Sequence, residues 1–339
     1  MMSKKGRTIA VTINFFWIED FMNKKHILDI ILFLVILFVL IAGSSYIIKP
    51  KDYDTYDLSV VKLKTKALEK EEENTIDVVF AGNSESCYTF SPLQLWGDYG
   101  ITSYDTGSGA QRLCDTYSIL IETFKRQSPK IVFLEMDSAF EEYPGVYKDD
   151  NEFDNTVEKI FPIFHYHSAY NGIQLPQFIL KYTNNRQNEK LYKGYQLRDT
   201  IDGFYDEPYV YGKDDNTLNT EAKEYLAKIK ELCEENKCEL ILVSAPSAMS
   251  WSEEKYEAVN EWAKSNSVKY YDLNKDNEKV GIDWTNDTYD RGVHVNIYGS
   301  KKATAYIGEI LKTDYSLTDH RTDTKYADWQ KDYEKAGLY

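Results

Sequence analysis

The chain contains, at residues 77–86, the stretch Asp77-Val-Val-Phe-Ala-Gly-Asn-Ser-Glu-Ser86. A short apolar run that leads into glycine and asparagine predicts a buried strand ending in a tight turn. In an open α/β sheet, ligands bind outside the carboxyl ends of the strands. We therefore expect Ser84, the first serine after this strand, to lie at the rim of a binding site. Ser86 would already belong to the following segment.

Strand and helix patterns alternate from Thr75 onward. Further strands are predicted over 101–104, 130–136, 239–243 and 268–272, and helices over 113–124, 219–234, 252–264 and 298–312. The last of these helices carries apolar residues on one face, as a helix packed against a sheet does. Such alternation predicts an α/β domain with a parallel sheet and helices on both of its faces.

A second polar stretch, Asp290-Arg-Gly-Val-His-Val-Asn-Ile-Tyr-Gly299, lies just before the last predicted helix. A serine hydroxyl is a poor nucleophile until an imidazole accepts its proton, and an acid then orients that imidazole. We therefore predict Ser84 as nucleophile, His294 as base and Asp290 as acid. Asp287 stays open as an alternative acid. The simpler interpretations are a serine that caps a helix, a turn at 290–292 and a histidine satisfied within a loop.

These stretches resemble the blocks of the SGNH, or GDSL-like, hydrolases. In that family the nucleophile follows the first strand in Gly-Asp-Ser, for which this chain has Gly82-Asn83-Ser84, and a late Asp-x-x-His block completes the triad. Here the late block is one residue longer, because Asp290 lies four positions before His294. The resemblance implies a three-layer, flavodoxin-like sheet.

The second block of the family is matched by Tyr104-Asp-Thr-Gly-Ser-Gly-Ala-Gln111, whereas Leu134-Glu-Met-Asp137 stands where the third block, Gly-x-Asn-Asp, is expected. The family's usual asparagine donor to the oxyanion is therefore absent. The resemblance implies an oxyanion site made by the backbone N–H groups of Ser84 and Gly109, with the Gln111 side chain as replacement donor. Gly107 can exchange roles with Gly109.

Within that superfamily, residues 75–330 resemble a membrane-anchored bacterial branch, similar to alginate acetylation proteins and to the D-alanine-transfer protein of teichoic acid modification. The resemblance implies transfer of an acyl group, most simply acetyl, onto a cell-surface or secreted polysaccharide. A multi-span membrane-bound O-acyltransferase would supply the group, which would rest as an ester on Ser84. Two alternatives stay open: a surface carbohydrate esterase, and a non-catalytic module that binds glycan or partner. No cofactor is implied.

Residues 27–48 form a continuous apolar run. As a helix rising ~1.5 Å per residue, it would cover about 30 Å, the hydrocarbon thickness of a bilayer. We predict a single transmembrane anchor, with a signal peptide cleaved near 42–44 as the alternative. Basic residues flank both ends, so the positive-inside rule does not orient it. The resemblance places the large domain outside the cytoplasm, on the cell membrane.

The remaining segments follow from these assignments. We predict a cytoplasmic or interfacial leader over 1–26, a charged stalk over 49–75, the SGNH-like domain over 76–315 and a tail over 316–339. Residues 138–217, acidic and aromatic, interrupt the alternation and contain a predicted helix near 173–183. They are interpreted as an insertion that covers the mouth of the cleft, or as a surface excursion.

Charge and metal-binding residue types restrict the ligands. A net charge of −15 and a pI near 4.9 disfavour a nucleic-acid partner, whose phosphates would be repelled. His165 and His167 are two apart, but no accompanying ligand set is evident, so no metal is predicted. The four cysteines allow the pairings Cys87–Cys114 and Cys233–Cys238, or four free thiols.

Overall fold

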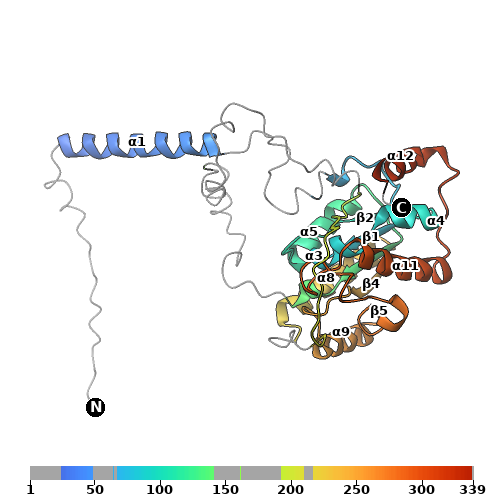
Figure 1. Cartoon of the computed structure of the whole chain (residues 1–339). Coiled ribbons are helices and arrows are strands. Elements are labelled where there is room, and N and C mark those ends of the chain that lie inside the picture. Colours follow the sequence, from blue (N-terminus) through green and yellow to red (C-terminus); the bar gives the residue numbers. More distant parts are fainter. Residues whose placement is uncertain are drawn as a thin grey trace, which may run out of the picture. The chain divides into compact units, whose positions relative to one another are not determined.

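The computed structural model describes residues 24–48, 64, 67–140, 161, 192–209 and 217–337. The chain divides into two compact units, one formed by Met1–Tyr53 and Gly145–Tyr182 and the other by Asp54–Pro144 and Thr183–Tyr339. In the first unit the structure describes helix α1, Lys24–Ile48 (Figure 1). Its segment His26–Ser45, 20 residues with a mean hydropathy of 2.9, is long and apolar enough to cross a membrane. The predicted leader lies almost entirely outside the described residues.

The second unit is built on a five-stranded sheet in the order β2-β1-β3-β4-β5, with every neighbouring pair parallel. The predicted α/β parallel fold is therefore confirmed. The strands are β1 Val78–Ala81, β2 Ser103–Asp105, β3 Ile131–Glu135, β4 Glu239–Ser244 and β5 Lys269–Asp272. Because all strands are parallel, their carboxyl ends meet at one edge of the sheet, where ligands bind in this fold class.

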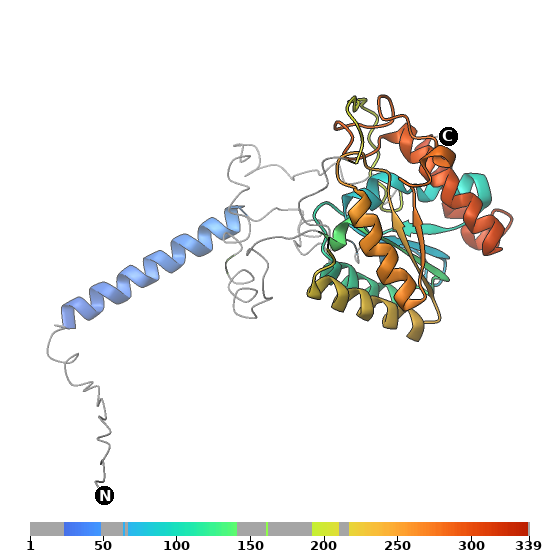
Figure 2. The ribbon, with the colours of Figure 1, turned by 90° about the horizontal axis from the view of Figure 1, so that it is seen from below.

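The helices connect the strands and cover the sheet (Figure 2). Each of the four predicted helices is present within a few residues of its expected bounds. The helices of this unit are α3 Ser84–Thr89, α4 Pro92–Tyr99, α5 Leu113–Phe124, α8 Thr220–Glu235, α9 Glu253–Asn266, α10 Asn277–Val280, α11 Ile297–Asp314 and α12 Ala327–Ala336, with 3-10 turns at Asp137–Ala139 and Thr324–Tyr326.

Two hydrophobic clusters, one on each face, produce the three layers. In β1, Val79 and Ala81 belong to one cluster, and Val78 and Phe80 belong to the other. This alternation follows from the two-residue period of a strand, and it requires apolar residues at every position of a strand covered on both faces. The first cluster includes residues of α5, α8 and α9, and the second includes Ala303, Ile307 and Leu311 of α11.

Segments outside the predicted domain bounds also pack on it. Leu68, which the sequence analysis placed in the stalk, is 2% exposed and belongs to the first cluster. In the tail, Trp329 belongs to the same cluster, and Nε2 of His320 lies 2.7 Å from Oδ2 of Asp77 at the start of β1. Residues 67–75 and the tail therefore contribute to the folded unit.

All four cysteines are free thiols, and neither predicted disulfide is formed. Cys233 lies in the last turns of α8, and Cys238 directly precedes β4. The backbone N–H of Cys238 donates to the carbonyl of Cys233 over 2.9 Å. A hydrogen bond with the Cys233 thiol and burial raise the pKa of the Cys238 thiol. The neighbouring pair is thus accommodated as buried thiols. The predicted helix near 173–183, His165 and His167 lie outside the described residues.

Candidate active site

Three side chains from opposite ends of the sequence form a hydrogen-bonded chain. Nε2 of His294 lies 2.8 Å from Oγ of Ser84, and Nδ1 of His294 lies 2.7 Å from Oδ2 of Asp290. Both hydrogen bonds can form when Nδ1 carries the imidazole proton and donates to Asp290, and when Nε2 accepts a hydrogen bond from the serine hydroxyl. The imidazole can then take the serine proton while the carboxylate stabilises the charge that develops. The structure thus brings together the three residues predicted as nucleophile, base and acid.

The turn at Arg291 and Gly292 explains how the late block holds one additional residue. Both residues have left-handed backbone conformations, with φ of 61° and 88°. The chain reverses there, so that Thr288 pairs with Val295 in an antiparallel bridge. Asp290 then faces His294 and also accepts its backbone N–H over 2.7 Å. One carboxylate therefore orients both the backbone and the ring of His294.

Asp287, the alternative acid, has other partners. Its Oδ2 accepts from the backbone N–H of Asp283 and lies 2.5 Å from Nζ of Lys302. Ser86 also points elsewhere, since its hydroxyl donates to Asp105 over 2.8 Å. Among the described contacts, Asp290 and Ser84 are the acid and the serine that form hydrogen bonds with the His294 ring.

The strand-to-helix turn places Ser84 as the first residue of α3. Gly82 permits this turn, because a Cβ there would lie 2.6 Å from Cβ of Glu135. Asn83 caps α3 by accepting from the backbone N–H of Glu85, and its amide donates to Asp137 over 3.1 Å. An aspartate at position 83 would instead face the Asp137 carboxylate. Asparagine at 83 therefore suits a chain that has Asp137 at the end of β3.

The predicted oxyanion donors have different surroundings. The Gln111 side chain is fully buried and donates to Thr116 over 2.9 Å, so this amide is engaged inside the domain. The N–H of Gly107 donates to the Asp105 carboxylate over 2.7 Å. Gly109 has open space around the position of a Cβ. The backbone N–H groups of Ser84 and Gly109 remain the predicted donors.

Glu85, beside the nucleophile, is a buried acid that sequence reasoning overlooked. Its Oε1 lies 4.0 Å from Nε2 of His294, and its side chain is 3% exposed. Burial raises the pKa of Glu85 well above its ordinary value, and the carboxylates of Asp137, Glu135 and Asp290 raise it further. Both effects favour the neutral form of the carboxyl.

An aromatic and cationic wall also borders His294. Tyr88 and Tyr289 lie with ring centroids 5.0 and 5.7 Å from that of the imidazole. The Arg198 guanidinium lies 4.6 Å from the Tyr88 ring centroid and donates to the Tyr88 hydroxyl over 2.9 Å. Arg198 belongs to 192–209, the longest part of the predicted insertion that the structure describes. No local sequence pattern connects Arg198 to the site, because the contact spans 110 positions.

No protein-family model matches the chain, and no relative among curated proteins was found. Three solved structures are similar. A candidate acylhydrolase from Bacteroides fragilis is 14% identical, with a TM-score of 0.37, over 77% of this chain and 98% of that one. A candidate platelet activating factor from Streptococcus pneumoniae is 12% identical, with a TM-score of 0.41, over 74% and 91%. A GDSL-like lipase from Bacteroides thetaiotaomicron is 14% identical, with a TM-score of 0.34, over 71% and 88%.

The structure itself has the α/β architecture that the sequence predicted, a five-stranded parallel sheet flanked by helices. In this chain the parallel sheet carries Ser84 directly after β1, and Asp290 and His294 precede α11. Among the described residues, no group of three or more His, Cys, Asp or Glu side chains is arranged to hold a metal ion.

Proposed function

We propose that this protein is a serine O-acyltransferase, anchored in the cell membrane by α1, that acylates a polysaccharide outside the cytoplasm. The observation that carries the proposal is the continuous Ser84–His294–Asp290 hydrogen-bonded chain. Ser84 would attack the carbonyl carbon of an acyl donor as His294 accepts its proton. Collapse of the tetrahedral intermediate would leave an acyl ester on Ser84 and expel the donor's leaving group, which takes the proton from His294.

In the second half-reaction, a sugar hydroxyl would give its proton to His294 and attack the ester. The acylated sugar would then be released, and the proton would return to Ser84. Water in place of the sugar would make the protein an esterase. The intact triad geometry favours either chemistry over a non-catalytic binding module.

The helix α1 supports transfer over hydrolysis. A free esterase gains little from a segment that can cross a bilayer, whereas an enzyme that receives an acyl group from a membrane-bound donor must stay close to it. Tethering of this kind raises the effective concentration of two partners to about the millimolar range. The partner we propose is a multi-span membrane-bound O-acyltransferase, and the acyl group is most simply acetyl.

Polysaccharide acylation in cells tests the proposal. Cells in which Ser84→Ala replaces the wild-type protein should make the polysaccharide but leave it unacylated, and the multi-span donor should co-purify with the full chain. A soluble version of residues 54–339, which keeps the whole second unit, would show by restoring full acylation that the anchor is dispensable. Increased acylation after deletion of the gene would establish the esterase instead.

A further inference from the structure

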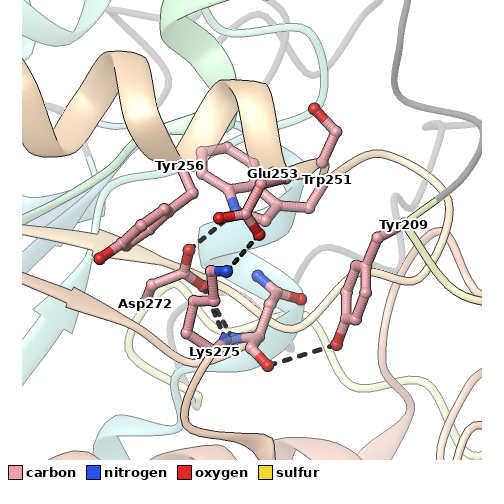
Figure 3. A pocket seen from close by; sticks show the side chains of 8 residues that line it. Tyr209, Trp251, Glu253, Tyr256, Asp272 and Lys275 are labelled. Atoms are coloured by element: carbon pink, nitrogen blue, oxygen red, sulfur yellow. Dashed lines mark hydrogen bonds and ion pairs between the residues drawn. The ribbon is translucent and has the colours of Figure 1, made fainter.

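A pocket of about 190 Å³ opens beside the carboxyl ends of β4 and β5 (Figure 3). It lies at the same edge of the parallel sheet as Ser84, although none of the triad residues lines it. The lining residues are Tyr209, Trp251, Ser252, Glu253, Tyr256, Asp272, Asn274 and Lys275. Sites for drug-sized ligands have volumes of roughly 300–1,000 Å³, so this pocket suits a ligand of about one sugar ring.

Aromatic side chains form its walls and are held in place by their own contacts. Figure 3 shows Tyr209 and Tyr256 on opposite sides of the pocket. The indole N–H of Trp251 donates to Asp272 over 2.9 Å, and the Tyr256 ring stacks on Tyr270 with centroids 5.9 Å apart. Rings fixed in this way lose little conformational entropy when a ligand packs on them.

The polar groups at the pocket mouth can exchange partners. Glu253 and Lys275 form an ion pair in which the side chains are 56% and 45% exposed. Exposed pairs of this kind stabilise a fold only weakly, so ligand hydroxyls can compete for both groups. Asp272 and Asn274, by contrast, are engaged in internal hydrogen bonds. The mouth therefore offers one acceptor and one donor that together have no net charge.

The pocket is connected to the triad through one loop. The Asn274 side chain accepts the backbone N–H of Ser247 over 2.8 Å, and the Ser247 hydroxyl donates to the carbonyl of Val293 over 2.6 Å. Val293 immediately precedes His294. Asn274, which lines the pocket, is thus connected through Ser247 to the residue before His294.

We propose that this pocket binds a neutral hexose unit of the glycan acceptor, an inference that rests on the proposed function. The C–H faces of a pyranose ring are apolar and match the face of Tyr209 and the face of Tyr256 that the Lys275 ammonium now covers at 4.8 Å from the ring centroid. Its hydroxyls would draw Lys275 away from that face and replace the contacts between Glu253 and Lys275. An anionic sugar would be opposed by Glu253 and by the buried Asp272. The pocket would hold one ring of the polymer while a neighbouring ring reaches Ser84.

Isothermal titration calorimetry on the detergent-solubilised full chain tests this assignment. The probes are cellotetraose, maltotetraose, chitotetraose and the anionic tetragalacturonate, and the Ser84→Ala variant is used so that no chemistry occurs. At least one neutral probe should bind. Tyr209→Ala and Tyr256→Ala should each weaken its binding by about tenfold, as expected for loss of a packed aromatic ring. Lys275→Met, at the exposed mouth, should weaken it without disturbing the fold.

Tyr205→Ala is the matched control, since Tyr205 is 81% exposed and does not line the pocket. Binding by none of the three neutral probes, unchanged affinity in all three pocket variants, or tighter binding of tetragalacturonate would each overturn the inference. Hydrolysis of p-nitrophenyl acetate by the wild-type chain is measured in parallel. Its absence would count against the proposed function, whereas hydrolysis with glycan binding insensitive to the pocket variants would remove only the pocket assignment.

Discussion

The imidazole Nε2 of His294 lies 2.8 Å from the hydroxyl of Ser84, although 210 positions separate the two residues in the sequence. The contact exists because β1 lies inside the sheet and the loop before α11 returns to its carboxyl end. Serine and base are therefore brought together by the parallel topology itself.

Ser84 should be the only reactive serine of the site. A fluorophosphonate probe should label the wild-type chain, and Ser84→Ala should abolish labelling because the hydroxyl in contact with Nε2 of His294 is removed. Ser86→Ala should keep it, since Ser86 donates to Asp105 instead. Labelling is read by gel fluorescence and by mass spectrometry of the modified peptide. Equal labelling of the two variants would contradict the assignment.

Asp290 should matter for catalysis, and Asp287 should not. Asp290→Asn should lower kcat for a small activated ester by up to ~10⁴-fold, because the imidazole loses the carboxylate that fixes its tautomer. Asp287 lies 2.5 Å from Lys302 and accepts from Asp283, so Asp287→Asn should change stability more than rate. Steady-state kinetics and thermal unfolding of both variants decide the matter. A severe loss of kcat for Asp287→Asn, with a mild one for Asp290→Asn, would reverse the roles.

Glu85 should act as a neutral side chain. Because burial and the nearby acids raise its pKa, Glu85→Gln keeps both its shape and its charge state. We expect kcat/KM for a small ester to stay within about threefold of wild type. A raised pKa destabilises the fold as pH increases, so Glu85→Gln should also gain stability over wild type at alkaline pH. A loss of 100-fold or more in kcat/KM would mean that the carboxyl takes part in the reaction.

Asp105 should make stability depend on pH. Burial raises the pKa of this carboxyl to about 7 in the folded chain, against about 3.9 when unfolded. Between these two values the folded state binds more protons than the unfolded state. The contribution of Asp105 to the free energy of unfolding is therefore largest below about pH 4, and it is lost as the pH rises through about 7. The slope is at most about 1.4 kcal/mol per pH unit. Denaturant unfolding at several pH values should show this slope in wild type and a smaller one in Asp105→Asn.

Lys193 should be important for stability. Its ammonium is 2% exposed and lies 2.9 Å from Glu71 and 2.7 Å from Asp332. Lys193→Met would leave two acids without their shared cation and should lower the free energy of unfolding by about 3–5 kcal/mol. Lys331→Met, at an exposed pair with Asp328, is the control and should change it by at most about 1 kcal/mol. Similar effects of the two variants in denaturant unfolding would disprove a special role for Lys193.

The sheet and the order of the triad could be predicted because they depend on local patterns. Buried apolar runs mark β1 and β3, and polar residues follow the strands whose ends form the site. The choice between Asp290 and Asp287 could not be made in this way. It depends on the left-handed conformations of Arg291 and Gly292, which turn Asp290 toward His294.

Side-chain direction was the main feature that the sequence did not reveal. Gln111 stands at the right place to replace a missing amide, but its side chain is turned into the domain toward Thr116. Arg198 and Tyr88 meet across 110 positions, and no periodicity links them. Contacts of this kind depend on tertiary packing, which a pattern of apolar and polar residues does not specify.

The contact between His320 and Asp77 has a consequence for the order in which the protein is synthesised and folds. Asp77 directly precedes β1, and its carboxylate contacts His320, which lies 243 positions later in the sequence. Helix α12 likewise packs against α4. During translation, β1 and Ser84 emerge first, whereas His294 emerges 210 positions after Ser84 and His320 emerges 243 positions after Asp77. A growing chain therefore carries Ser84 without His294, and the hydrogen-bonded triad can form only after the loop before α11 has been made.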